Sequence, residues 1–199
     1  MDVSTLITLA LVAVVLIWLV QLYNRLVRVK HNVAAAWSNI DVLLQQRHDE
    51  LPNLVATCKQ YMNYERDTLE RVVKARAGVE QAREDGDVLA LGTAEATLHS
   101  SLGGLFALAE NYPDLKADHA FGQLQTRISS IEDAIADRRE FYNASVNANN
   151  IAIAEFPTVI VARAFNFSAA DLLVVPEAKK AEVKVANLFD DGGDIRKAS

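Results

Sequence analysis

A run of apolar residues near the N-terminus limits what the rest of the chain can be. From Val3 to Asn24 there is no charged residue, and Leu6 to Val20 consists almost wholly of Leu, Val, Ile and Ala. A helix needs about 20 residues to cross roughly 30 Å of hydrocarbon, so this stretch is long enough to span a bilayer. Trp18 and Tyr23 lie near its end, where amphipathic rings favour the membrane interface. We therefore predict a transmembrane anchor over residues 1–24.

A cleaved signal peptide is the alternative interpretation of this stretch. Such peptides begin with a positively charged region and end in small residues at the cleavage site. Here the only early charge is Asp2, and the residues from Trp18 to Leu22 are bulky. These features favour an anchor that stays attached to the protein.

The charges that flank the span predict its orientation. Arg25, Arg28 and Lys30 follow the apolar run, and no Lys or Arg precedes it. An excess of Lys and Arg stays on the cytoplasmic side of a membrane. We expect a single-pass protein with a short outer N-terminus and a cytoplasmic body, including Ser199.

Composition excludes some functions for that body. The net charge is -6, which argues against nucleic-acid binding because such binding depends on Lys and Arg that neutralise phosphates. Cys58 is the only cysteine, so the chain contains neither an intramolecular disulfide nor a cysteine metal cluster. We expect Cys58 to be a small buried group, because it lies on the apolar stripe of its segment.

Apolar residues at steps of three and four continue beyond the anchor and predict helices. They run through Val33, Trp37, Ile40 and Leu44, then through Leu51, Leu54, Cys58 and Tyr61, and on to Leu69 and Val72. Arg47 and Glu65 interrupt this stripe with charge. Pro52 lies inside it, and its ring disfavours helical geometry at the preceding residue. Either Pro52 begins a new helix after a turn, which we favour slightly because proline fits a helix start, or the helix continues through a kink.

Later breaks divide the remaining sequence into helices. Residues 84–87 form a charged turn around a glycine, and a helix follows to about Glu110. Residues 111–114 break the pattern again, and Asp114 is the expected cap of the last long helix. Phe156-Pro157 ends that helix.

The sequence thus predicts an all-α protein with one N-terminal transmembrane helix and an up-and-down four-helix bundle over residues 25–167. The segment 158–167 is apolar but too short to span a bilayer, so it is either a core cap or an interfacial helix. The fourth helix would bring this segment back to the membrane surface. Residues 168–199 are expected to be an extended or disordered tail.

No residue pattern in the chain predicts catalysis or cofactor binding. A di-iron bundle needs two Glu-x-x-His motifs and further carboxylates, whereas Glu95 and His99 share a helix face without a second pair. Glycine-rich phosphate loops and nucleophile motifs are likewise lacking. We therefore predict no catalytic, cofactor-binding or metal-binding residues and no enzyme activity.

Small residues and asparagines provide the candidate interface residues. Ala34, Ala35 and Ala36 lie just outside the membrane, where small side chains let helices approach closely. Asn143, Asn147 and Asn150 are spaced four and three apart and so share one helix face, as do Asn24, Asn32 and Asn39 on the first helix. Asparagine is a poor interior helix residue, so such rows require a reason. We predict that Asn147 is buried and hydrogen-bonded to another helix or another chain.

Short motifs in a fixed order extend through most of the chain. They are Tyr23-Asn24, Val33, Ala36-Trp37-Ser38, Ile40-Asp41-Val42, Arg47, Pro52-Asn53-Leu54-Val55, Tyr61, Glu65, Leu69-Glu70, Ala75-Arg76, Tyr112-Pro113-Asp114-Leu115-Lys116-Ala117, Phe121, Leu124-Gln125, Tyr142-Asn143 and Phe156-Pro157. In these motifs the chain resembles the LemA family of bacterial membrane proteins. It departs from the family at Gln45 and Gln46, which replace basic residues, at Tyr64, which replaces a frequent histidine, and at Asn149, which replaces an aromatic residue.

The resemblance implies an N-terminal anchor in the bacterial inner membrane, a four-helix bundle and a cytoplasmic body. It brings no catalytic residue, and it implies a neighbouring membrane metalloprotease of the HtpX kind as a partner in membrane-protein quality control. From residues and resemblance together we expect a self-associating scaffold or adaptor without activity of its own. The alternatives are a lipid-binding or membrane-shaping protein that uses the segment near Phe165, and an enzyme or metal protein whose site forms between subunits.

Overall fold

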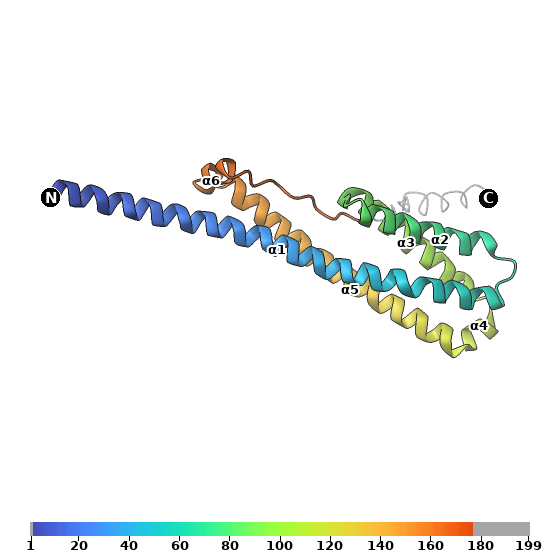
Figure 1. Cartoon of the computed structure of the whole chain (residues 1–199). Coiled ribbons are helices and arrows are strands. Elements are labelled where there is room, and N and C mark those ends of the chain that lie inside the picture. Colours follow the sequence, from blue (N-terminus) through green and yellow to red (C-terminus); the bar gives the residue numbers. More distant parts are fainter. Residues whose placement is uncertain (1, 177–199) are drawn as a thin grey trace, which may run out of the picture.

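The structure is a computed structural model that describes residues 2–176 as an elongated set of six helices (Figure 1). The helices are α1 (Val3–Tyr61), α2 (Arg66–Glu84), α3 (Val88–Ala109), α4 (Pro113–Ala117), α5 (His119–Ala154) and α6 (Thr158–Ala164). All regular elements of the described residues are helices, which confirms the predicted all-α class. The long helices α1, α2, α3 and α5 form the bundle, and α4 is a single short turn at its far end.

The first part of α1 projects beyond every other element. Its side chains from Val3 to Val20 are exposed, Leu11 by 62% and Ile17 by 58%. By length and composition α1 is a helix that is able to cross a membrane, and none of its most apolar stretch is buried in the protein. This is the part predicted as the anchor.

α1 continues from that stretch into the bundle and runs through Pro52 without interruption. The predicted turn at Pro52 is therefore wrong, and the alternative of a continuing helix is correct. Proline leaves the carbonyl four residues earlier without its helical donor. Here that carbonyl belongs to His48, and it accepts a hydrogen bond of 3.0 Å from Nε of Arg76 on α2. The actual turn lies at residues 62–65, between α1 and α2.

The connections between the remaining bundle helices follow local signals. Gly86 has a φ of 67°, a left-handed conformation that glycine adopts without strain, and it forms the predicted turn between α2 and α3. Asp87 caps α3 by accepting hydrogen bonds from the backbone N–H groups of Leu89 and Ala90, at 3.0 and 2.9 Å. The expected cap at Asp114 is wrong, because Asp114 lies in the first turn of α4 and Asp118 caps α5 instead.

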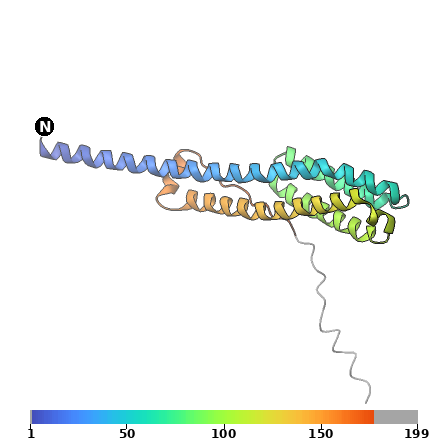
Figure 2. The ribbon, with the colours of Figure 1, turned by 90° about the horizontal axis from the view of Figure 1, so that it is seen from below.

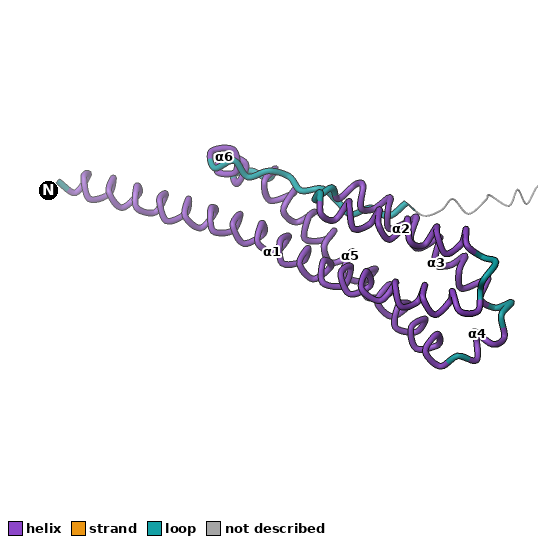
Figure 3. The backbone as a smooth tube through the Cα atoms, turned by 45° about the vertical axis from the view of Figure 1, so that its right-hand side comes forward, coloured by secondary structure: helices purple, strands orange, loops and turns teal. Residues whose placement is uncertain are grey.

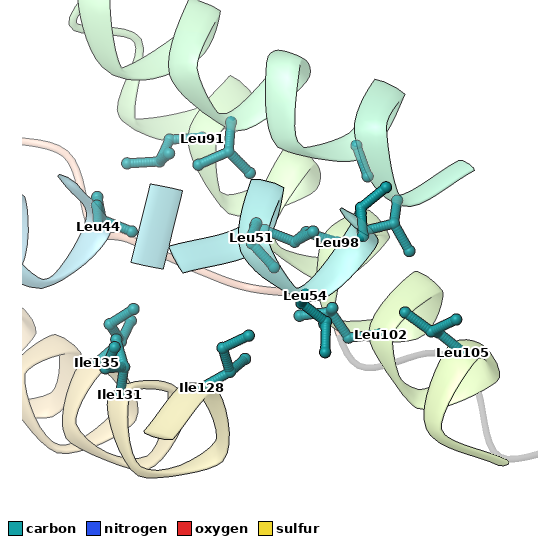
Figure 4. Close-up of a cluster of buried hydrophobic side chains, with 14 of the residues drawn as sticks. Leu44, Leu51, Leu54, Leu91, Leu98, Leu102, Leu105, Ile128, Ile131 and Ile135 are labelled. Carbon is teal, nitrogen blue, oxygen red and sulfur yellow. The ribbon is translucent and has the colours of Figure 1, made fainter. Parts of the chain in front are cut away.

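The core fills the space between the four long helices (Figure 4). Leu44, Leu51 and Leu54 of α1 meet leucines of α3 and isoleucines of α5 there, as the steps of three and four predict. Cys58 lies in the same stripe and is fully buried, which confirms its predicted burial. This burial raises the pKa of its thiol to about 11. Viewed from below, α5 runs alongside α1 back toward the projecting end (Figure 2).

After α5 the chain turns at Phe156-Pro157, and α6 packs across α1. Leu26, Ala152, Val161 and Ala162 form a second small core at this junction. Residues 168–176 then run back along the bundle without helical structure (Figure 3), and we call this segment the strap. The strap is the described part of the predicted tail, and residues 177–199 lie outside the described residues.

The hydrogen bond between Arg76 and the His48 carbonyl leads to a double-mutant prediction. Arg76→Met should lower the free energy of unfolding by about 1–3 kcal/mol, because it leaves the partly buried acceptor without its donor. In a Pro52→Ala background residue 52 supplies the missing N–H, so the same replacement should cost about 1 kcal/mol less. Denaturant unfolding of the detergent-solubilised chain measures both values.

Arg71→Met serves as the control in both backgrounds, because among residues 2–176 the Arg71 guanidinium bonds only to Thr68 in its own helix. Equal costs of Arg76→Met in the two backgrounds would mean that the carbonyl bond contributes nothing.

Candidate functional site

A cluster of charged side chains lies inside the bundle, where apolar residues are expected. Arg47 of α1 is 2% exposed and forms a buried ion pair with Glu95 of α3, which is 6% exposed. A second carboxylate, Glu132 of α5, places its Oε1 3.8 Å from Nη1 of Arg47. One guanidinium thus faces two carboxylates from two different helices.

The cluster lies at the base of a cleft of about 560 Å³ between α3 and α5. The cleft exists because these two helices stand apart, and no Cα atom of α3 lies within 8 Å of one in α5. Leu173, Val175 and Pro176 of the strap form part of its wall. The strap therefore covers the side of the bundle on which the charges lie.

The environment of Glu132 favours its neutral form. Burial raises the pKa of this carboxyl above its ordinary value, although the charges of Arg47 and of His99 act in the opposite direction. His99 is largely exposed, and its Nδ1 lies 3.5 Å from Oε1 of Glu132. That Oε1 atom is buried and accepts no hydrogen bond from the described residues. The cluster thus ties α1 to α3 and α5 through charged side chains. It also contains one carboxyl, that of Glu132, whose proton is held to a higher pH than that of an ordinary glutamate.

Sequence reasoning detected only part of this cluster. Arg47 stood out as a charge at an apolar position of the stripe, and Glu95 and His99 were seen to share a face. Glu132 was missed, because a glutamate among many on a long helix carries no distinguishing pattern. A charged residue within an apolar stripe is the signal that such a cluster exists, but it does not identify the partners.

Two of the predicted asparagines hold the strap by pairing with its backbone. Asn150 donates from Nδ2 to the carbonyl of Ala170 at 2.9 Å, and its Oδ1 accepts from the Ala170 N–H at 3.0 Å. Asn143 makes the same pair with Leu173, at 3.1 and 2.9 Å. Each side-chain amide thus replaces the neighbouring strand that an extended segment normally requires.

The spacing of the two asparagines matches the spacing of the strap. Seven helical residues span about 10.5 Å, and three extended residues span about 10 Å. Between the two pairs, the Tyr142 hydroxyl donates to the carbonyl of Asp171 at 2.9 Å. The side chain of Leu173, whose backbone pairs with Asn143, is buried in the main core. Gly92 makes room for the strap, since a Cβ atom there would lie 2.1 Å from the carbonyl oxygen of Val174.

The other candidate interface residues lie in different surroundings. Ala36 is buried within the bundle, whereas Ala34 and Ala35 are exposed. Asn147 is also exposed, so its predicted burial against a helix of its own chain is wrong. The physical reason is angular, because position 147 lies about 40° beyond Asn143 on the helix, on the side away from the core. Its contact with another chain stays a prediction.

Asn149 was missed as a functional position. It is 4% exposed and donates from Nδ2 to the Ser168 carbonyl at 3.3 Å, at the start of the strap. The row of asparagines on the first helix behaves differently, since Asn24, Asn32 and Asn39 are all exposed.

The charged cluster predicts opposite behaviour for its two carboxylates. Glu95→Gln should lower the free energy of unfolding by about 3 kcal/mol, because it breaks a buried ion pair. Glu132→Gln should be neutral or stabilising at pH 7, because the folded state disfavours the charge that it removes. Thermal unfolding followed by circular dichroism, on the full chain in detergent, measures both effects.

The pH dependence provides the control for this prediction. The folded chain binds the Glu132 proton more firmly than the unfolded chain, so stability should fall as the pH rises from the ordinary carboxyl range to the raised pKa. Glu132→Gln should abolish that fall. If Glu132→Gln destabilises the protein as much as Glu95→Gln does, the two carboxylates share the charge of Arg47 equally.

The asparagine pairs predict a local loss of protection in the strap. Asn143→Leu and Asn150→Leu each remove two hydrogen bonds worth about 1 kcal/mol apiece, so the amides of Leu173 and Ala170 should exchange about tenfold to thirtyfold faster. Hydrogen exchange read by mass spectrometry measures this change. Asn147→Leu is the matched control on the same helix, and an equal rise in that variant would show that the pairs do not hold the strap.

Comparisons with known proteins find relatives that match most of the chain. Magnetosome protein MamQ 2 of Paramagnetospirillum magneticum is 25% identical over 192 residues, covering 85% of this chain and 71% of that protein. Magnetosome protein MamQ of Magnetospirillum gryphiswaldense is 28% identical over 158 residues, covering 68% of this chain and 58% of that protein. Protein LemA of Metamycoplasma hominis is 27% identical over 165 residues, covering 83% of this chain and 74% of that protein.

A family model provides the decisive match. The model of the LemA family matches residues 36–186, which include the bundle from Ala36 of α1 onward, α6 and the strap. This range also contains the charged cluster and the asparagines that pair with the strap. The chain therefore belongs to the LemA family.

Proposed function

We propose that the protein is a membrane-anchored, self-associating scaffold or adaptor without catalytic activity of its own. The observation that carries this proposal is the continuity of α1, which is at once the candidate membrane span and a central helix of the bundle. A body tied to its anchor by a helix, rather than by a flexible linker, is held at a defined height and orientation. Such an arrangement suits a protein whose task is to present a surface.

The height follows from helix geometry. From Asn24, at the end of the span, α1 continues to Tyr61, which places the far end of the bundle about 55 Å from the bilayer. Two side-chain hydrogen bonds lie at that end. The Tyr61 hydroxyl donates to Asp118 at 2.8 Å, and the Tyr112 hydroxyl donates to Glu65 at 3.1 Å. These bonds join the connecting segments between the helices at the far end of the bundle.

The proposed location is the bacterial inner membrane, with the bundle in the cytoplasm. Arg25, Arg28 and Lys30 support this orientation through the positive-inside bias. The adaptor role includes a membrane protein partner such as a protease of the HtpX kind. Relatives that carry different names, magnetosome protein and LemA, suit a scaffold used in several settings better than one dedicated reaction.

The proposed subunit contact uses the face that α1 and α5 present just above the membrane. A shallow groove of about 360 Å³ lies there between Ala35 of α1 and Ala144 and Ala148 of α5. Phe141, at its edge, is 56% exposed. Small residues let a second helix approach closely, and two copies anchored in one bilayer meet about an axis normal to it.

Disulfide cross-linking in native membranes tests this proposal. Because Cys58 is fully buried, Ala35→Cys provides the one accessible thiol, and a two-fold contact near Ala35 brings two such thiols together. We expect a disulfide-linked dimer on mild oxidation of Ala35→Cys and a weaker one for Asn147→Cys. Ala77→Cys, which is exposed on α2, is the matched control and should remain monomeric.

Two outcomes would contradict the proposal. A chain that yields no dimer from either position, and that also runs as a monomer after mild detergent extraction, does not self-associate. Equal cross-linking of Ala35→Cys and Ala77→Cys would indicate random collision in the membrane.

A further inference from the structure

Large apolar side chains remain exposed where α6 meets α1. Phe156 is 79% exposed, Ile160 is 60% exposed and Phe165 is 62% exposed. They belong to a segment that is otherwise well packed, since Val161 and Ala162 are buried against α1. The segment therefore presents one apolar face to the protein and a second to its surroundings.

A groove of about 410 Å³ runs along this junction. Leu19, Val20 and Tyr23 of α1 form one wall, and Ile160 and Ala164 of α6 form the other. The Phe165 ring closes one end, because its centroid lies 4.9 Å from that of Tyr23. Apart from the Tyr23 hydroxyl, the side chains of these residues are hydrocarbon, so an occupant makes few polar contacts with them.

The position of the groove limits what fills it. Its α1 wall is the end of the candidate membrane span, and the span contacts no other described element before this level. About 20 residues of helix cross the hydrocarbon, so Tyr23 lies at the boundary between the acyl chains and the headgroups. The groove therefore opens into the bilayer, where hydrocarbon chains are the most abundant ligand.

Cations lie on the same two helices that form the groove, next to its walls in the sequence. Arg163 is exposed on α6, and Nζ of Lys30 lies 5.9 Å from the centroid of the Phe167 ring. Arg25 pairs with Glu155 at 3.3 Å, so one of these positive charges is already balanced. The remaining charge is positive, which suits an anionic phosphate above an apolar groove.

We propose that the junction of α1 and α6 binds one anionic phospholipid, with an acyl chain in the groove and its phosphate near Arg163 and Lys30. This inference rests on the proposed membrane anchoring. α6 then lies at the bilayer surface with Phe156, Ile160 and Phe165 turned into the acyl region. The protein thus contacts the membrane at a second element besides its span.

Quenching of tryptophan by lipids with brominated acyl chains tests the depth of α6. The full chain is placed in phosphatidylglycerol–phosphatidylcholine bilayers. It contains only two tryptophans, Trp18 and Trp37, so variants with a single tryptophan need few replacements. In a Trp37→Phe variant, Trp18 reports on the span alone. With Trp18→Phe added, Ile160→Trp reports on the groove, and Leu89→Trp on α3 is the matched control because Leu89 is 62% exposed.

We expect Ile160→Trp to lose as much fluorescence as Trp18 loses and Leu89→Trp to lose none. Loss at Ile160→Trp equal to that at Leu89→Trp, with Trp18 quenched, would overturn this inference and leave the anchor intact. If Trp18 itself is not quenched, the span is outside the bilayer and the proposed anchoring fails.

Filling the groove tests for a held acyl chain. Protein extracted in mild detergent should retain phosphatidylglycerol in native mass spectrometry, and Ala164→Phe should lose it because the new ring occupies the groove. Ala90→Phe, at an exposed position of α3, is the control and should retain the lipid. Equal lipid retention by both variants would overturn the site, even if α6 touches the bilayer.

Discussion

The hydrogen bond from Arg76 to the carbonyl of His48 satisfies the acceptor that Pro52 leaves without a helical donor inside the longest helix. Without a donor for that carbonyl, Pro52 would favour a break within the part of α1 that belongs to the bundle. With it, α1 remains helical over 59 residues. The helices α2, α4, α5 and α6 pack against α1, and α3 packs mainly against α2. α5 follows α1 back toward the membrane, α6 crosses it, and α2 supplies the donor that keeps it unbroken.

Features that depend on neighbouring residues were predictable from the sequence. The apolar run to Val20, the turn at Gly86 and the three–four stripe through Cys58 each follow from local composition, and the structure agrees with them. The prediction at Pro52 was wrong because the missing backbone donor is visible in the local sequence. The donor that replaces it belongs to Arg76, 24 residues away. Asp114 was misjudged because four residues later a second aspartate, Asp118, takes the same capping role.

The candidate site depended on contacts between distant parts of the chain, so the sequence predicted its residues better than their partners. The asparagine row correctly marked Asn143 and Asn150 as unusual, but their partners lie 30 and 20 residues away in a segment that was expected to be an extended or disordered tail. An extended segment needs backbone partners, and helical asparagines supply them without a second strand. Likewise, Arg47 revealed a buried charge but not the two helices that balance it.

The order of the elements links the membrane to the charged cleft. α6 ends at Ala164, and the first strap contact, between Asn149 and Ser168, follows four residues later. The strap then reaches Leu173 and Val175, which wall the cleft over Arg47 and Glu132. Because the segment between α6 and the strap is so short, we expect a shift of α6 to move Ser168 and Ala170 as well. The apolar face of α6 and the cleft that the strap covers are thus joined by a short segment, and both lie along the uninterrupted helix α1.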